Sequence, residues 1–279
     1  MPSKEERTSR RIKSKKHRPV LFILFLIIAA LFFLYKEFGR EDSLFKKPLK
    51  PEIVKHVKPA VPLPKVAVVI DDLGPNRETA LEIFNLNVSF TLSILPHEAH
   101  TKWIADEGHR LGYDVIGHIP MEAKGPLSPG KGGLYTWMTG DEIIETLETD
   151  INSIPHLQGA SNHMGSAFTE DERVMNIFMT VIKEHNLFFL DSLTTHGSAG
   201  FKTAEKQGLK ALKRDVFLDN EESHDYIEAQ WEQLIKIAQK KGHAVGLAHA
   251  RKATIEFFRK TLPSHKVTVV PITELFQSN

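Results

Sequence analysis

From residue 65 onward, short apolar runs alternate with amphipathic stretches of helical length, and this alternation restricts the possible folds more than any other feature. Eight apolar runs cover residues 66–71, 89–94, 114–119, 159–164, 187–191, 215–219, 243–249 and 266–272. Helical patterns cover residues 78–86, 98–111, 141–154, 170–185, 198–207, 223–241 and 254–262. Strands that are apolar on both faces and are followed by helices are typical of a parallel sheet. Seven or eight such units in about 215 residues predict a closed or nearly closed (β/α) barrel, with a flavodoxin-like open sheet as the alternative.

The segment before this domain has a different composition. Residues 1–19 carry eight Lys and Arg against two Glu, and residues 20–35 are a run of sixteen without a charge, a proline or a polar amide. As a helix at ~1.5 Å per residue, this run covers ~24 Å of a hydrocarbon core that is ~30 Å thick. We therefore expect a basic cytoplasmic tail over residues 1–19 and an uncleaved transmembrane signal-anchor over residues 20–36. A buried core helix and a cleaved signal peptide are the alternatives, although the bulky residues 31–35 contain no small-x-small cleavage site.

The remaining composition excludes several classes of function. Residues 37–64 are charged and punctuated by Pro, which predicts a semi-rigid linker to one domain over residues 65–279. Outside residues 1–19 the chain has 28 basic and 33 acidic residues, a net charge of −5. This argues against a nucleic-acid-binding surface, which needs a clustered basic face. The absence of Cys excludes disulfides, thiolate metal sites and Cys nucleophiles.

Six of the eight apolar runs end in Asp or His. The residues at these ends are Asp71 with Asp72, His118, His163 after Asn162, Asp191, Asp219, and His249. In a parallel barrel the C-terminal ends of the strands converge on one face, where such enzymes hold their active sites. Carboxylates and neutral imidazoles without sulfur are ligands for zinc or a similar divalent ion. The sequence therefore predicts a metal centre at this face.

Each strand-end residue also has a structural interpretation. Asp219 is equally well explained as the cap of the next helix, whereas the hydroxyl residues after Asp191 can do that capping, so Asp191 is interpreted as functional. Asp71 and Asp72 are adjacent and therefore point in different directions. One of them can bind a metal, while the other faces the reacting water and serves as a base.

The order of "VAVVIDDLG", "FTLSILP", "HIPMEA", "SNHMGS", "FFLDSLTT", "RDVFLDN" and "GLAHA" resembles the YibQ-like divergent polysaccharide deacetylases, distant relatives of the NodB-homology (carbohydrate esterase family 4) deacetylases. The resemblance covers about residues 65–276. It implies a distorted (β/α)7-8 barrel and metal-dependent hydrolysis of N- or O-acetyl groups on a polysaccharide. By the same resemblance Asp71 is the general base, Asp72 is a metal ligand, and His249, in a Leu-x-His match, is the general acid.

The sequence departs from that pattern in two places. The superfamily's second motif supplies two metal histidines four residues apart, but here His118 is followed by Glu122. Either His163 supplies the missing imidazole, or Glu122 binds as a carboxylate. The Arg-Pro-Pro-Tyr-like motif that shapes the oxyanion site is also missing, and "NHMGS" stands in its place, which makes Asn162 and Ser166 candidates for substrate binding.

We therefore expect a metal-dependent hydrolase anchored in the bacterial inner membrane by a single span, with its domain on the periplasmic side. Its partner would be an acetylated glycan, either peptidoglycan or an exported polysaccharide. Asp72, His118 and His163 would hold zinc, and the catalytic candidates are Asp71, His249 and Asp191.

The long connection over residues 120–140 is rich in Gly and Pro and predicts a lid or binding loop. Its aromatic residues Tyr135 and Trp137 either stack on sugar rings or form a hydrophobic lid packed on the barrel. Two other functions stay open. One is a catalytically weak or inactive barrel that binds a glycan or a division partner. The other is a phosphoester hydrolase, which the lack of a basic cluster or a Gly-rich phosphate loop disfavours.

Overall fold

The computed structural model describes residues 18–38, 63–262 and 267–277, which belong to two compact units, residues 1–60 and residues 61–279. In the first unit, α1 (Arg18–Phe38) shows that the apolar run is helical. No helix within these ranges is both long and apolar enough to cross a membrane. The predicted signal-anchor over residues 20–36 is therefore not supported. The predicted basic tail and Pro-rich linker lie almost wholly outside the described residues.

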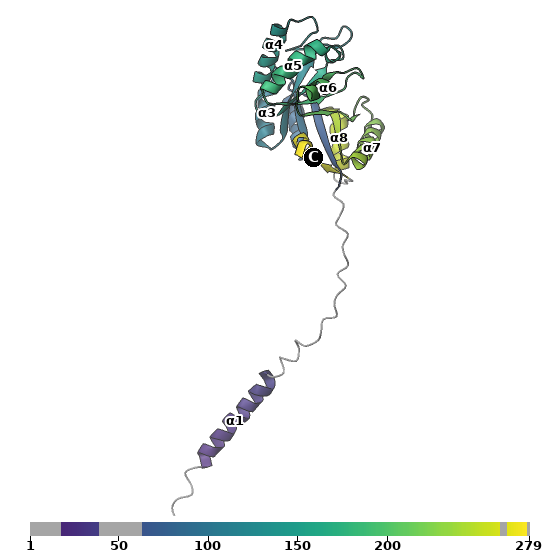
Figure 1. The fold of residues 1–279 in the computed structure, drawn as a ribbon. Helices are drawn as coiled ribbons and strands as arrows, with labels where there is room; N and C mark the ends of the chain where they lie inside the picture. Colours follow the sequence, from purple (N-terminus) through teal and green to yellow (C-terminus); the bar gives the residue numbers. More distant parts are fainter. Residues whose placement is uncertain (1–17, 39–62, 263–266, 278–279) are drawn as a thin grey trace, which may run out of the picture. The chain divides into compact units, whose positions relative to one another are not determined.

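A curled parallel sheet forms the centre of the second unit (Figure 1). Its strand order is β6-β5-β4-β3-β2-β1-β8-β7, and β9 also pairs with β1. The strands are β1 (Lys65–Leu73), β2 (Thr91–Ile94), β3 (Asp114–Met121), β4 (Gly159–Met164), β5 (Phe188–Asp191), β6 (Ala211–Lys213), β7 (Val216–Phe217), β8 (His243–His249) and β9 (Thr268–Val269). From β1 to β6, strands that are neighbours in sequence are neighbours in the sheet, and β1 also pairs with β8. This is the order of a (β/α) barrel, whereas a flavodoxin-like sheet reverses its strand order at a switch point.

Seven helices follow the predicted helical patterns. They are α2 (Arg77–Phe84), α3 (Thr101–Arg110), α4 (Gly140–Ser153), α5 (Glu172–Glu184), α6 (Gly200–Lys206), α7 (His224–Lys241) and α8 (Lys252–Thr261), and the short turns η2 (Phe168–Glu170) and η4 (Ile272–Gln277) complete the unit. A capping box of Thr139 and Glu142 satisfies free N–H groups at the start of α4. The helix α7 begins after Ser223 and ends at Gly242, whose φ of 89° is readily adopted by glycine.

Side-chain alternation along the strands separates an outer from an inner face. Val68 and Ile70 of β1 pack outward in one apolar cluster with residues of α2, α3, α7 and α8. Ala67 and Val69 pack inward in a second cluster with residues of β3, β5, β8 and η4. Because strand side chains alternate, the next inward position on β1 is Asp71, above this apolar interior.

One crossing segment connects the two edges of the curled sheet. The strand β6 pairs with β5, and β7 pairs with β8. Between them, the N–H of Arg214 donates to the Asp191 carbonyl at 3.0 Å, and the N–H of Asp215 donates to the Val245 carbonyl at 2.8 Å. The predicted strand over residues 215–219 is therefore wrong in its bounds, because the chain changes partner strands between residues 214 and 215.

The last predicted strand, over residues 266–272, is also shorter than expected. Pro271 lacks an N–H group, so a strand ladder cannot continue through it. Beyond Pro271, the N–H of Ile272 donates to the Thr91 hydroxyl at 3.0 Å, and the N–H of Thr273 donates to the Asp114 carboxylate at 2.9 Å. The C-terminal segment thus runs past the N-terminal ends of β2 and β3.

Candidate metal centre

Three predicted ligands converge at the C-terminal ends of β1, β3 and β4. The Oδ1 atom of Asp72 lies 2.9 Å from Nδ1 of His163 and 3.3 Å from Nε2 of His118, and the two ring nitrogens are 3.2 Å apart. His118 and His163 each follow an inward-facing residue, Ile116 and Ser161, by two positions. Within the described part of the chain, these three residues form the group whose atoms lie close enough together to hold one ion.

The end of β1 is irregular, and this irregularity brings two adjacent carboxylates close to the same side chain, that of His118. The register of β1 against β2 shifts between Ile70 and Leu73, and Asp72 has a φ of 59°. Asp enters this left-handed region more readily than most residues do, and strand bulges commonly re-aim side chains. As a result, the inward Asp71 and its neighbour Asp72 both face His118.

The donor set and its spacing fit a divalent ion. With ligand bonds of ~2.0–2.1 Å, a tetrahedral zinc ion separates its ligand atoms by roughly 3.3–3.4 Å. The three separations of 2.9–3.3 Å are close to one face of such a tetrahedron. The Oδ1 atom of Asp72 is buried and has no hydrogen-bond partner among the described residues. A cation would satisfy this buried anionic oxygen.

The charge state of Asp72 suits a ligand. Burial alone would raise the pKa of Asp72, but the nearby rings of His118 and His163 outweigh burial and hold the pKa well below its ordinary value. Asp72 is therefore an anion at any physiological pH.

Asp71 has the opposite environment. It is 2% exposed, and its Oδ1 atom has no hydrogen-bond partner in the described ranges. Burial raises the pKa of Asp71 above its ordinary value, although nearby His118 and a hydrogen bond from Ser93 partly offset that effect. A buried carboxylate with a free oxygen can accept a proton.

His249 and Asp219 form a pair beside the cluster. Nε2 of His249 lies 3.6 Å from Oδ2 of Asp72, and Nδ1 lies 3.1 Å from Oδ1 of the fully buried Asp219. The other oxygen of Asp219 accepts the backbone N–H of His249 and the hydroxyl of Thr254. The cap of α7 is Ser223, so the capping interpretation of Asp219 is wrong. The nearby Ser223 was the sequence signal that Asp219 was available for another role.

Asp191, predicted as catalytic, is turned toward α6 instead. Its carboxylate accepts the N–H of Leu193 at 3.0 Å, the hydroxyl of Ser198 at 2.8 Å and the N–H of Phe201 at 2.9 Å. These contacts satisfy the N-terminal turn of α6. The geometry gives Asp191 a structural role, because alternation puts its side chain on the outer side of β5 with Phe189, one position after the inward Leu190.

Glu122 and His163, the two alternatives for the third ligand, differ in their contacts. Oε2 of Glu122 accepts the N–H of Thr136 at 2.7 Å and its hydroxyl at 2.6 Å. Glu122 therefore holds the long loop at the end of β3, and the group that could hold an ion contains His163 beside Asp72 and His118.

Asn162 and Ser166, predicted to bind substrate, also form hydrogen bonds with the backbone of neighbouring segments. The amide oxygen of Asn162 accepts the N–H of Ser192 at 2.9 Å, and its amide nitrogen donates to the Met164 carbonyl at 2.8 Å. Asn162 is 1% exposed. The Ser166 hydroxyl accepts the N–H of Lys124 at 2.9 Å. The polar "NHMGS" segment thus supplies one candidate ligand, His163, and two side chains, Asn162 and Ser166, that bind backbone N–H groups.

The aromatic residues of the long loop form a stacked pair. The rings of Tyr135 and Trp137 are 5.4 Å apart at an angle of 22°. Trp137 is 69% exposed, which is unusual for so large an apolar side chain. The residue between them is held by Glu122 and by the Arg173 guanidinium, which donates to the Thr136 carbonyl.

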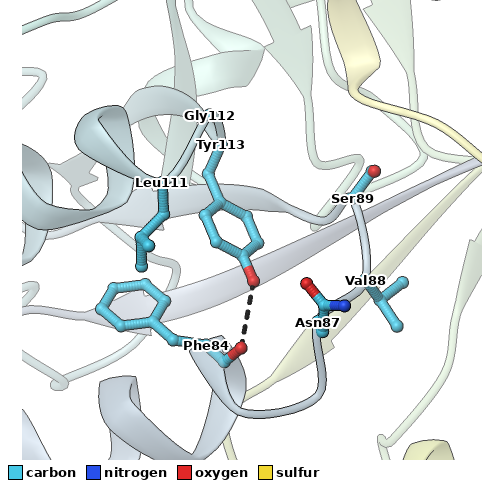
Figure 2. A pocket seen from close by; sticks show the side chains of 7 residues that line it. All are labelled: Phe84, Asn87, Val88, Ser89, Leu111, Gly112 and Tyr113. Carbon is cyan, nitrogen blue, oxygen red and sulfur yellow. Dashed lines mark hydrogen bonds between the residues drawn. The ribbon is translucent and has the colours of Figure 1, made fainter.

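Two cavities lie at the other end of the sheet. One of about 130 Å³ is bordered by Ser89 and Tyr113, immediately before the strands β2 and β3, and the Tyr113 hydroxyl donates to the Phe84 carbonyl (Figure 2). The second, of about 480 Å³, is bordered by Gln158 and Lys210, next to the starts of β4 and β6. Both are at N-terminal strand ends, opposite the candidate metal centre.

Comparisons with known sequences agree with this architecture. The sequence model of a family described as divergent polysaccharide deacetylase matches residues 68–276. The chain is 31% identical over 198 residues to the uncharacterized protein YibQ of Escherichia coli (strain K12), covering 70% of this chain and 61% of YibQ. It is 33% identical over 191 residues to an uncharacterized protein of Haemophilus influenzae (strain ATCC 51907 / DSM 11121 / KW20 / Rd), covering 68% of each. The matched region is thus less than two thirds of the length of YibQ.

A solved structure shares the fold. The crystal structure of an uncharacterized protein from Agrobacterium tumefaciens C58 superposes with a TM-score of 0.73 at 23% identity, covering 77% of this chain and 90% of that chain. The curled parallel sheet with its outer helices is therefore an arrangement found in another solved protein.

Proposed function

Because the chain belongs to the divergent polysaccharide deacetylase family, we propose that it hydrolyses acetyl groups on a polysaccharide with the help of a divalent metal. The observation that carries the proposal is the ligand triangle of Asp72, His118 and His163, which faces Asp71 and the His249–Asp219 pair. A proton acceptor and a proton donor thus lie on either side of one ion-binding position.

Asp72, His118 and His163 would hold the ion, and zinc suits a set of one carboxylate and two imidazoles. When bound, the ion acts as a Lewis acid toward the acetyl carbonyl. The proton transfers of the reaction belong to residues of the chain.

Asp71 accepts the proton of the attacking water. Its Oδ1 atom has no other partner among the described residues, and its raised pKa makes it a stronger base than an ordinary carboxylate. The water oxygen bonds to the acyl carbon as this proton leaves.

His249 gives a proton to the departing sugar nitrogen or oxygen as its bond to the acyl carbon breaks, and the products are acetate and a free amine or hydroxyl. Asp219 supports this role because its carboxylate accepts the Nδ1–H of His249 and turns Nε2 toward Asp72. Each proton-transfer residue typically contributes ~10²–10⁴-fold in rate.

The Tyr135–Trp137 pair would bind a sugar ring of the glycan. Leu134, immediately before the pair, bridges to Met121 at the end of β3. Met121 is three residues beyond His118, or ~10 Å along a strand. The high exposure of Trp137 favours a sugar platform over a lid packed on the barrel.

The proposal is tested by acetate release. The metal-loaded full-length chain is incubated with acetylated peptidoglycan, chitin oligosaccharides and acetylated xylan. We expect wild type to release acetate from at least one of them, and Asp71→Asn to be slower by at least ~100-fold with unchanged metal content. Glycan binding by wild type without acetate release would favour the alternative of a binding module that lacks turnover. The periplasmic location remains a prediction, which accessibility of a labelled domain in intact cells would test.

A further inference from the structure

Two buried serines connect His118 to Asp71 through hydrogen bonds. The Ser161 hydroxyl is 2.8 Å from Nδ1 of His118, and the hydroxyls of Ser161 and Ser93 are 3.0 Å apart. Ser93 is in turn a hydrogen-bond partner of the Asp71 carboxylate. Both serines have no exposed surface. They come from β4 and β2, the strands on either side of the His118 strand.

The direction of this chain of hydrogen bonds is set at both ends. Nε2 of His118 faces the ligand triangle, so Nδ1 carries the ring hydrogen and donates it to Ser161. A carboxylate can only accept, so Ser93 donates to Asp71. Ser161, which has one hydroxyl hydrogen, must therefore donate to Ser93.

We propose that Ser161 and Ser93 are positioning residues that couple the metal ligand His118 to Asp71. This inference rests on the metal centre of the proposed function. Ser161 holds the His118 ring in the orientation that presents Nε2 to the ion. Ser93 accepts the hydroxyl hydrogen of Ser161, which leaves the Ser161 oxygen free to accept the Nδ1–H of His118. Ser93 also orients the carboxylate of Asp71. Ser93 thus acts on the metal ligand only through Ser161.

Removal of either hydroxyl has a defined consequence. In Ser161→Ala the buried Nδ1–H of His118 loses its acceptor, and loss of such an outer partner typically weakens metal binding by ~10–100-fold. Ser93→Ala weakens binding less, because Ser161 keeps its contact with His118. The double variant binds metal as Ser161→Ala does, since the hydrogen bonds that connect Ser93 to the His118 ring run through Ser161.

The test is the zinc affinity of the full-length chain, measured by competition with a chromophoric chelator for wild type, both single variants and the double variant. Thr91→Val is a matched control. Thr91 is a fully buried hydroxyl on the same strand as Ser93, but it accepts the N–H of Ile272 instead of contacting the site. We expect Thr91→Val to lower the melting temperature and to leave zinc affinity within about twofold of wild type.

Two results would overturn the inference: a Ser161→Ala affinity within twofold of wild type, or single-variant losses that multiply in the double variant. A second readout separates this inference from the proposed function. In the metal-free proteins, the imidazole ¹⁵N shifts of His118 report which ring nitrogen carries hydrogen, and we expect Nδ1–H in wild type and a mixture in Ser161→Ala. If wild type binds no zinc, the proposed function fails, and identical shifts in the two proteins would then overturn the inference.

Discussion

Asp150 provides a quantitative test of how the long loop is packed, because it is a buried carboxyl with one unpartnered oxygen. Its Oδ1 atom lies 2.8 Å from Nε2 of His97, and its Oδ2 atom has no hydrogen-bond partner within the described ranges. A Cβ atom at Gly132 would lie 2.0 Å from Oδ1, so the loop backbone covers the carboxyl. Burial raises the pKa of Asp150 to about 8.

This raised pKa makes stability depend on pH in a defined direction. The ordinary pKa is 3.8, so the folded protein binds more protons than the unfolded chain between about pH 4 and pH 8. The protonated carboxyl therefore contributes stability at low pH, and this contribution is lost as the pH rises toward 8. The loss is about 1.4 kcal/mol per pH unit, or about 2–3 kcal/mol between pH 5.5 and 7.5.

Asp150→Asn removes the titrating group and keeps its shape. We expect the free energy of unfolding of the variant, relative to wild type, to rise by about 2–3 kcal/mol from pH 5.5 to pH 7.5 in urea titrations. A constant offset from the buried amide does not affect this slope. Asp141→Asn, which removes a carboxylate from the exposed start of the same helix, corrects for the general change in charge. Parallel curves for wild type and Asp150→Asn would refute the reasoning.

Other contacts give further expectations. Asp219→Asn should lower acetate release by roughly 10²–10⁴-fold with unchanged metal content, because the protonated ring of His249 loses its anionic acceptor; an unchanged rate would contradict the acid role. Thr139→Ala should lower the free energy of unfolding by about 1 kcal/mol in urea titration, since it removes the α4 cap; unaltered stability would mean that the capping box is dispensable. Asn162→Ala should speed hydrogen exchange of the Ser192 amide, which donates to the Asn162 side chain, and unchanged exchange would argue against that fastening role.

Much of the fold follows from the sequence because local pattern and tertiary arrangement agree. The apolar runs at residues 159–164 and 243–249 have the same bounds as β4 and β8. Since parallel strands bring their C-terminal ends together, position predicts that Asp72, His118 and His163 lie at one face of the sheet, and they do.

The remaining features depend on tertiary contacts that no local pattern encodes. Asp191 and Asp219 both end apolar runs, yet one is bound by the start of α6 and the other by His249. Likewise, the sequence allows Glu122 as a ligand, but in the folded protein its carboxylate accepts the N–H of Thr136 from the long loop. The split of the sixth strand arises because one segment must pair with both edges of the sheet.

The central claim is that Asp72, His118 and His163 hold one divalent ion, and metal content tests it most directly. Full-length wild type, His163→Ala and Glu122→Gln are each loaded with zinc, freed of excess ion and analysed by atomic absorption. We expect about one zinc per chain in wild type and in Glu122→Gln, and a loss of bound zinc in His163→Ala, because three ligands plus an open position define such a site. Wild type without tightly bound metal, or zinc retained by His163→Ala and lost by Glu122→Gln, would contradict the account.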